Sequence, residues 1–128
     1  LVPANGFYEW KQVQKGKEPY YFFPPDEGLF GFAGLWETWT GPDGGQLESC
    51  TILTVDANEF MSPIHNRMPL ILAPEDYERW MTAAPADAQT LIQPFADERM
   101  RAYPVSKAVG NVRNNSAALI AEIAPPVA

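Results

Sequence analysis

The chain has 128 residues, of which 46% are apolar and 12% aromatic, and its formal net charge at pH 7 is −7. This length and composition predict one globular domain and exclude a disordered chain, and no apolar run approaches the ~20 residues of a membrane span. The charge disfavours a broadly basic nucleic-acid-binding surface, but a local group of Arg and Lys can still bind phosphate, because salt screens charges beyond about 8 Å.

The first predicted elements form a hairpin. Aromatic-rich strands are predicted over residues 7–10 and 20–23, and a polar turn at residues 15–17 joins them. Two prolines at positions 24 and 25 end the second strand. Thirteen prolines and nine glycines in the whole chain favour short strands with tight connections over long helices.

Two further strands follow around a clear turn. A strand is predicted over residues 29–39, where Gly31 and Gly34 permit a bulge or a close backbone approach. The Gly-Pro-Asp-Gly-Gly segment at 41–45 predicts a turn. Residues 49–55, rich in Thr, Ile, Leu and Val, predict the next strand.

Short helices appear in the second half of the chain. Residues 58–62 suit a helical turn, and residues 68–72 suit a short apolar strand. A helix is predicted from Pro74, since an early proline followed by acidic residues favours a helix start. Its apolar face would carry Tyr77, Trp80 and Met81. A second short helix is predicted over residues 86–95.

Strands at residues 100–105 and 119–123 complete the pattern. The elements together predict an α+β domain with a curled, barrel-like and mostly antiparallel sheet and a few short peripheral helices. The domain would span residues 1–124, and residues 125–128 would form a tail. Because the sequence opens at Leu1, without Met and directly in a strand pattern, we expect the C-terminal major part of a longer polypeptide.

One carboxylate lies inside an aromatic cluster near the N-terminus. Glu9 stands between Tyr8 and Trp10, and strand alternation places it on the same face as Phe7. Gly6, just before this cluster, suggests a backbone held close to another group. A carboxyl group among apolar side chains is typical of a general acid. The alternative is an outward-facing strand residue without a chemical role.

The only histidine of the chain, His65, lies in the segment Ile-His-Asn-Arg-Met-Pro at residues 64–69. An imidazole and a carboxylate are the usual acid/base pair, so Glu9 and His65 are candidate catalytic residues. Arg67 would share a side with His65 and offers a forked donor for phosphate. The alternative is a surface histidine or one hydrogen-bonded in the core. One His and one Cys without paired spacing predict no metal site, and no cofactor is expected.

Four other residues have both a functional and a structural interpretation. Cys50 has no nearby cation to activate its thiol, so we interpret it as a residue of the protein core. Since a single cysteine cannot form an internal disulfide, we expect a reducing compartment. Trp10 is the tryptophan best placed to stack on a base, although most tryptophans pack in cores. Lys107 and Arg113 lie in a Gly- and Asn-containing stretch at 105–114 that suits either a phosphate-binding loop or a solvated connection.

Five blocks of the sequence together resemble the SRAP family (SOS response-associated peptidase, the abasic-site processing proteins), in the family's order. The blocks are Leu-Val-Pro-Ala-Asn-Gly-Phe-Tyr-Glu-Trp at 1–10, Phe-Ala-Gly-Leu-Trp-Glu at 32–37, Cys-Thr-Ile-Leu-Thr at 50–54 with Asp-Ala-Asn at 56–58, Ile-His-Asn-Arg-Met-Pro at 64–69, and Tyr-Pro-Val-Ser at 103–106. One block alone would be weak, but the ordered set is specific. The resemblance implies a compact α+β domain around a curled sheet.

The resemblance also implies a function. Members of the family bind single-stranded DNA and trap abasic sites through a cysteine that becomes N-terminal once the initiator Met is removed. That cysteine forms a stable thiazolidine with the ring-opened deoxyribose aldehyde. By this resemblance Glu9 would handle protons in ring opening and crosslink reversal, and His65 would shuttle protons in imine formation. By the same resemblance Arg67 would contact DNA phosphate and Trp10 the lesion nucleotide. Lys107 and Arg113 are further candidate DNA-binding residues, from the composition of their loop and not from the resemblance.

Two features depart from the family pattern. The family's cysteine precedes the Gly-Phe-Tyr-Glu-Trp segment and is not in this sequence, so this chain alone is expected to be inactive. Cys50 cannot replace it, because the reaction needs a terminal amine beside the thiol. Position 66 is Asn where the family more often has Asp, which affects how His65 is oriented.

Two other functions stay open from the residues alone. One is a non-catalytic module that binds single-stranded nucleic acid, and the other is an acid/base hydrolase that uses Glu9 and His65 without a thiol. In the leading interpretation the partner is single-stranded DNA with abasic sites and not a membrane. The expected location is the cytoplasm, in association with the nucleoid if the protein is bacterial.

Overall fold

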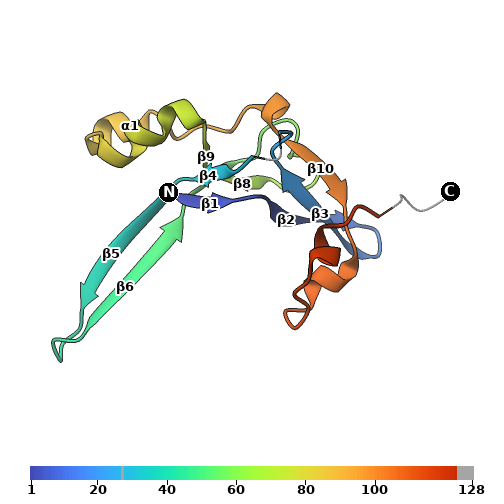
Figure 1. The fold of residues 1–128 in the computed structure, drawn as a ribbon, viewed down its shortest axis with the longest axis horizontal. Coiled ribbons are helices and arrows are strands. Elements are labelled where there is room, and N and C mark those ends of the chain that lie inside the picture. The colour runs from blue at the N-terminus through green and yellow to red at the C-terminus, as the bar shows by residue number, and fades with distance from the viewer. Residues whose placement is uncertain (27, 124–128) are drawn as a thin grey trace.

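The structure is a computed structural model that describes residues 1–26 and 28–123. The predicted tail at 125–128 therefore lies outside the described residues. Within these residues ten strands form antiparallel pairs, and short helices lie at the periphery (Figure 1). The strands are β1 (Val2–Ala4), β2 (Phe7–Val13), β3 (Gly16–Phe23), β4 (Phe30–Phe32), β5 (Gly34–Thr40), β6 (Gln46–Ile52), β7 (Thr54–Asp56), β8 (Arg67–Pro69), β9 (Ile71–Leu72) and β10 (Arg101–Pro104). The helices are α1 (Tyr77–Thr82) and α2 (Pro85–Gln89), with 3-10 turns η1 (Pro74–Asp76), η2 (Asp97–Arg99), η3 (Lys107–Gly110) and η4 (Ala117–Ile120).

The described strands form four sheets, in the orders β1-β4-β9, β10-β3-β2, β5-β6 and β7-β8. The expected α+β class with mostly antiparallel pairing is therefore confirmed. These sheets do not close into a barrel, because strands that the sequence predicts as continuous change partners partway along. The strands predicted over residues 29–39, 49–55 and 68–72 are each interrupted at a single residue.

A ring of backbone hydrogen bonds marks this change of partners. The interruptions fall at Ala33, Leu53 and Leu70, which separate β4 from β5, β6 from β7 and β8 from β9. The Ala33 amide donates to the Leu70 carbonyl at 2.8 Å, the Leu70 amide to the Leu53 carbonyl at 2.8 Å, and the Leu53 amide to the Ala33 carbonyl at 3.0 Å. The three interruptions are thus joined to one another at one point, where Ala33 and Leu70 are buried.

The aromatic hairpin is the predicted one, and it carries Phe7 into the core. Gly16 begins β3 with a φ of +96°, a conformation that side chains other than glycine rarely adopt. The Phe7 ring stacks on Phe22 with centroids 5.1 Å apart and packs edge-on against Phe32. The buried core around it comprises Phe22, Phe30, Phe32, Ala33, Val55, Met61, Met68, Leu70, Ile71, Leu72 and Met100.

The other face of the β10-β3-β2 sheet carries tyrosines. Tyr21 lies between Tyr8 and Tyr103 on the neighbouring strands, and its hydroxyl donates to the Asn5 carbonyl at 3.0 Å. Burial raises the pKa of Tyr21 above its usual value, and the neighbouring Tyr103 and Tyr8 raise it further. A Cβ on Gly6 would overlap the Tyr21 ring, so the close approach expected at Gly6 is present.

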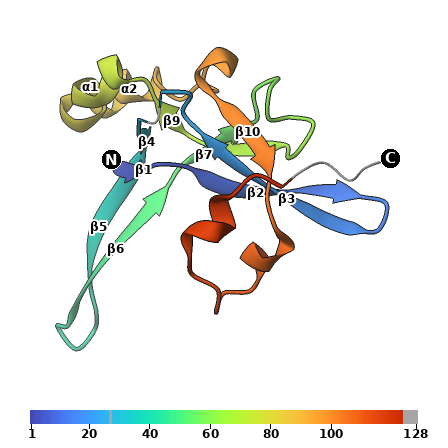
Figure 2. The ribbon, with the colours of Figure 1, turned by 45° about the vertical axis from the view of Figure 1, so that its right-hand side comes forward.

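The C-terminal segment differs from its prediction. Residues 119–123 do not form a strand, because i to i+3 hydrogen bonds build the 3-10 turn η4 there instead. The Tyr103 hydroxyl donates to the Ile120 carbonyl at 2.6 Å, which holds this turn against the tyrosine face of the sheet. In Figure 2 this segment, coloured red, returns from below the strands and passes beside β2 and β3. A single bridge between Val105 and Glu122 is the strand-like pairing that the prediction retains.

The ribbon of β5 and β6 projects from the body of the molecule (Figure 1). Every residue of β6 is exposed, including Cys50, so the interpretation of Cys50 as a core residue is wrong. Apolar residues are exposed on the ribbon as well, among them Leu35, Trp36 and Trp39. The turn at 41–45 is the predicted one, and Gly44 takes a φ of +80° in it.

The predicted helices are present in shorter form. Turn η1 and helix α1 follow Pro74 as expected, with Tyr77 and Trp80 packed against the core and Met81 exposed. Gly31 lies against the Tyr77 ring, where a Cβ would clash. Helix α2 ends at Gln89 rather than near residue 95. None of the helices built from the described residues is long and apolar enough to cross a membrane.

Candidate active site

Strand β2 presents Glu9 at the edge of the core. Glu9 pairs with Tyr20 across the hairpin and, by alternation, shares the core-facing side of the sheet with Phe7. Its side chain is 25% exposed, so the carboxylate is reachable from solvent. One carboxylate oxygen, Oε1, accepts a hydrogen bond from the Trp10 backbone amide at 3.0 Å. The other, Oε2, faces His65.

The turn between β7 and β8 presents His65 to this carboxylate. The His65 amide donates to the Met61 carbonyl at 3.1 Å, which ends a short helical turn that begins at Asn58. His65 Nδ1 lies 3.8 Å from Glu9 Oε2, and the histidine side chain is 39% exposed. This separation is longer than a hydrogen bond but short enough for ionic attraction when the imidazole is protonated. The fold thus brings together two ionisable groups that are far apart in the sequence.

The backbone of Arg67 suits both forms of the Nδ1 atom of His65. Nδ1 lies 3.1 Å from the Arg67 amide nitrogen and 3.0 Å from the Arg67 carbonyl oxygen. Without a proton Nδ1 accepts from the amide, and with a proton it donates to the carbonyl. Among the described residues the ring makes its polar contacts through Nδ1, which leaves Nε2 to a substrate. The imidazole can therefore gain or lose a proton without moving.

The Arg67 guanidinium is bound to its own protein. Nη1 donates to Asp56 Oδ1 at 2.7 Å, and Nη2 donates to the Thr54 carbonyl at 2.8 Å and the Thr54 hydroxyl at 3.0 Å. The pairing of β7 with β8 sets this arrangement, since Asp56 lies directly opposite Arg67. The side chain is 44% exposed, so a phosphate can approach a guanidinium that Asp56 already orients.

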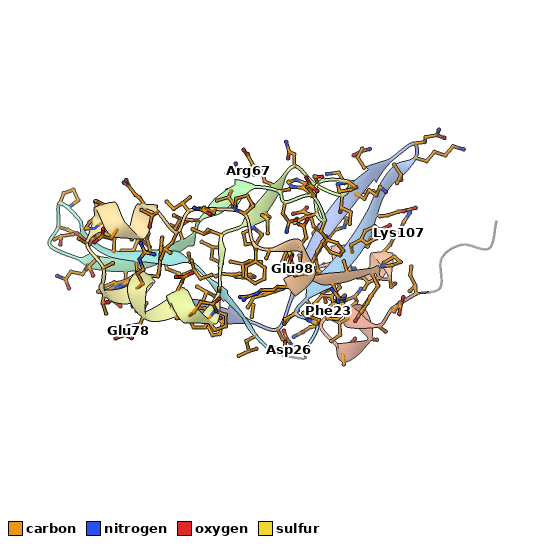
Figure 3. The ribbon with its side chains drawn as sticks, turned by 90° about the horizontal axis from the view of Figure 1, so that it is seen from above. Phe23, Asp26, Arg67, Glu78, Glu98 and Lys107 are labelled. Carbon is orange, nitrogen blue, oxygen red and sulfur yellow. The ribbon has the colours of Figure 1, made fainter. Side chains whose placement is uncertain are left out.

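Trp10, Lys107 and Arg113 lie apart from the pair of Glu9 and His65. Alternation along β2 points Trp10 to the opposite face of the sheet from Glu9. Lys107 and Arg113 are exposed on the segment that follows β10, and the Val105 amide ties the start of that segment to the Pro19 carbonyl at 3.0 Å. Figure 3 shows Lys107 well separated from Arg67.

Thr54, Asp56 and Asn58 contribute to the site although the sequence assigned them no role. Asp56 and Thr54 hold the Arg67 side chain, and Asn58 lies in the turn that carries His65. Positions 54 and 56 share one face of a strand, so an acid and a hydroxyl at this spacing can together hold one basic side chain. Which side chain they hold depends on the register with β8, which the sequence does not give.

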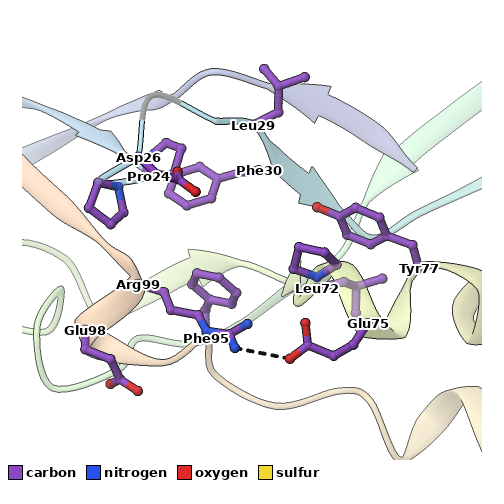
Figure 4. Close-up of a pocket in the computed structure, with 12 residues that line it drawn as sticks. Pro24, Asp26, Leu29, Phe30, Leu72, Glu75, Tyr77, Phe95, Glu98 and Arg99 are labelled. Carbon is purple, nitrogen blue, oxygen red and sulfur yellow. Dashed lines mark hydrogen bonds and ion pairs between the residues drawn. The ribbon is translucent and has the colours of Figure 1, made fainter.

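Other features of the surface lie away from this pair. A pocket of about 310 Å³ has an apolar floor that includes Phe30, Leu72 and Phe95, and Arg99 and Glu75 form an ion pair on its rim at 3.1 Å (Figure 4). A backbone hydrogen bond of Glu75, and then Arg99, lower the pKa of the Glu75 carboxyl. Residues 1–26 and 28–123 contain no group of three or more His, Cys, Asp or Glu that could hold a metal ion.

Comparisons with known proteins identify similar chains. The family model described as SOS response associated peptidase (SRAP) matches residues 1–112. The sequence is 43% identical over 124 residues to the abasic site processing protein YoqW of Bacillus subtilis (strain 168), covering 94% of this chain and 55% of that protein. It is 36% identical over 145 residues to the abasic site processing protein HMCES of Xenopus tropicalis, covering 96% and 43%.

Solved structures share the fold. A crystal structure of a protein from Bacteroides thetaiotaomicron matches with a TM-score of 0.86 and 30% identity, over 96% of this chain and 56% of that one. A second, from Bordetella bronchiseptica, matches with a TM-score of 0.75 and 28% identity, over 82% and 53%. The chain thus spans about half the length of the proteins to which it is similar.

Proposed function

This chain belongs to the SOS response associated peptidase family, and we propose that it carries the proton-transfer residues of a protein that processes abasic sites in DNA. The relatives at 43% and 36% identity are both named abasic site processing proteins. The observation that carries the proposal is the approach of His65 Nδ1 to within 3.8 Å of Glu9 Oε2. Two partly exposed groups at this distance can act as acid and base on one substrate bound beside them.

The proposed nucleophile belongs to a longer polypeptide. Because the chain spans about half of each relative, we propose that it is the C-terminal part of one domain. A cysteine upstream, made N-terminal by autoproteolytic removal of the initiator Met, would supply the thiol and amine. This chain alone would then be inactive, and the whole protein would form a thiazolidine crosslink with abasic single-stranded DNA. A cytoplasmic, nucleoid-associated location follows from that substrate if the protein is bacterial.

Proton transfers accompany each step of this reaction. Opening of the abasic sugar removes a proton from its C1′ hydroxyl and delivers one to the ring oxygen, which yields the aldehyde. The terminal amine adds to the aldehyde, and the carbinolamine loses its hydroxyl as water to give an imine. The thiol then adds to the imine carbon, and its proton passes to the nitrogen. We assign ring opening and crosslink reversal to Glu9 and the loss of water to His65.

The same pair is organised for these transfers. Glu9 Oε1 is fixed by the Trp10 amide, so Oε2 is the oxygen that exchanges a proton. His65 keeps a backbone partner at Nδ1 in both of its forms, and its Nε2 is available to the sugar. Packing of Trp10 against the lesion, and contacts of Lys107 and Arg113 with DNA, stay predictions.

Replacing Arg67 with Ala is expected to weaken binding of single-stranded DNA. The slope of log affinity against log salt concentration should fall by about one, the value for one lost phosphate contact. The reason is that the Arg67 guanidinium is 44% exposed and oriented by Asp56, in the residue whose backbone contacts His65. The measurement is the dissociation constant against salt concentration by fluorescence anisotropy.

Arg99→Ala provides a matched control for Arg67. Arg99 is also paired with a carboxylate and is 46% exposed, close to the 44% of Arg67, but it lies on the rim of the pocket in Figure 4. Its replacement should leave the salt dependence unchanged. Equal losses of affinity in the two variants would show that charge alone, and not a contact of Arg67, governs binding.

The proposed function is tested by incubating the full-length protein, with its N-terminal cysteine, with single-stranded DNA that contains one abasic site. We expect a protein–DNA band that survives SDS and that is absent with intact DNA or with the cysteine replaced by serine. Binding without such a band would mean a non-covalent binding module instead. Turnover that persists in the serine variant would mean an acid/base hydrolase.

A further inference from the structure

The turn that carries His65 is built around a buried amide. Asn58 is 8% exposed and is the buried polar side chain of the described residues. It lies between β7 and β8, in the loop whose ends are joined by the Ala57 amide donating to the Asn66 carbonyl at 3.0 Å. A side chain of this kind is buried only when its donors and acceptor find partners.

Asn58 bonds in two directions. Its Oδ1 accepts from the Met61 amide at 2.9 Å, within the loop. Its Nδ2 donates to the Phe95 carbonyl at 2.8 Å and contacts Met100 Sδ at 3.3 Å, both from a distant part of the chain. Asn58 therefore attaches the loop to the segment that precedes β10 from within the core. At the surface, the Phe60 amide donates to Asp97 Oδ1 of the same segment at 3.2 Å.

The contacts of Asn58 continue to His65 through Met61. The Met61 amide is bound by Asn58, and the Met61 carbonyl accepts from the amides of Ile64 at 2.8 Å and His65 at 3.1 Å. The Ser62 amide also donates to the Asn58 carbonyl at 2.9 Å, which completes one helical turn. Met61 itself is fully buried in the core. The His65 backbone is thus held relative to the core through Met61, whose side chain is buried and whose amide is bound by Asn58.

We propose that Asn58 is the positioning residue that sets the distance of His65 from Glu9. Nδ1 and Oε2 are 3.8 Å apart, so a shift of the turn by about 1 Å would separate the pair or press it together, and shifts of this size cost about 100-fold in rate. Without its internal amide, a loop from residue 57 to residue 66 would sample several conformations. The catalytic consequence rests on the proposed function, whereas the structural one does not.

Two substitutions separate the bonds of Asn58. Asn58→Ala removes both, so it releases Met61 and the link to Phe95. Asn58→Ser keeps an oxygen that can cap the Met61 amide, since serine serves as well as asparagine at the start of a helical turn, but it loses the link to Phe95. Val105→Ala is a control for lowered stability, because Val105 is also buried and lies in the C-terminal part of the chain.

The test uses the full-length protein and measures the crosslinking rate at saturating abasic DNA, the affinity for that DNA, and the ring resonances of His65 by NMR. A His65→Asn spectrum identifies those resonances. We expect Asn58→Ala to slow crosslinking at least 10-fold, change the affinity less than 2-fold, and shift or broaden the His65 signals. Asn58→Ser should restore the rate to within about 3-fold of wild type.

Several results would overturn the proposal. One is a folded Asn58→Ala protein with unchanged His65 signals and the crosslinking rate of wild type. Another is an equal loss of rate in Val105→Ala, because the effect would then be one of stability. If Asn58→Ala does not fold, unaltered His65 signals in Asn58→Ser beside a tenfold slower reaction would overturn it. If the wild-type protein forms no crosslink, the proposed function fails, and the His65 signals alone then decide the role of Asn58.

Discussion

Replacing Glu9 with Gln is expected to slow crosslink formation by about 10²- to 10⁴-fold, the range typical of a lost general acid or base. Glutamine has nearly the same shape, and its amide oxygen can still accept from the Trp10 amide as Oε1 does. It cannot take or give a proton at the position of Oε2, 3.8 Å from His65. The single-turnover rate with abasic single-stranded DNA, followed on SDS gels, measures the effect, and crosslink reversal should slow as well.

A control for this substitution is Glu48→Gln, which removes the same charge from the exposed ribbon of β5 and β6. We expect wild-type rates for Glu48→Gln and similar melting temperatures for both variants. Wild-type crosslinking and reversal in a folded Glu9→Gln protein would contradict the role of Glu9. A loss of rate accompanied by a large loss of stability would instead assign Glu9 a structural role in strand β2.

The elements that the sequence predicted well are those with local causes. The hairpin of β2 and β3 follows from two aromatic runs around a glycine that takes a positive φ. The turn at 41–45 and the start of η1 at Pro74 likewise depend on residues within a few positions of each other. Such signals are contained in any short window of the sequence.

The elements that it predicted less well have distant causes. Gly34 and Pro69 stand beside two of the breaks, but neither fixes where the break falls, because each break is made by a hydrogen bond between two of Ala33, Leu53 and Leu70. Cys50 reads as a core residue from its β-rich surroundings, but the ribbon around it projects from the body. Local composition does not reveal which surface a strand will face.

In the candidate site, too, the sequence identified what depends on local residues and missed what depends on tertiary contacts. Residue types and the family resemblance identified Glu9, His65 and Arg67 as candidates, and the fold places Glu9 and His65 within 3.8 Å of each other. The supporting contacts, such as Asp56 with Arg67 and Asn58 with Met61, were not identified. They depend on the register of β7 with β8 and on the conformation of the loop between them, which are tertiary properties.

Replacing His65 with Ala is expected to slow imine formation by about 10²- to 10³-fold, while affinity for abasic DNA changes less than 3-fold. The imidazole is the group that can release a proton to the departing hydroxyl, whereas DNA binding is assigned to other side chains. Rapid-quench measurement of the imine, trapped with borohydride, separates this step from the later closure of the thiazolidine ring. Free imidazole in the buffer should restore part of the rate in the alanine variant.

His65→Asn distinguishes proton transfer from a structural role of the ring. An asparagine side chain can still accept a hydrogen bond from the Arg67 amide, which Nδ1 accepts at 3.1 Å in the native chain. Its amide group, however, cannot act as an acid or a base near neutral pH. If His65 acts as a proton shuttle, the Asn and Ala variants should be equally slow. If the histidine only holds the backbone of Arg67 in place, the Asn variant should recover most of the rate, and the shuttle would be excluded. The comparison therefore decides between the two roles, because asparagine keeps the polarity of histidine and alanine does not.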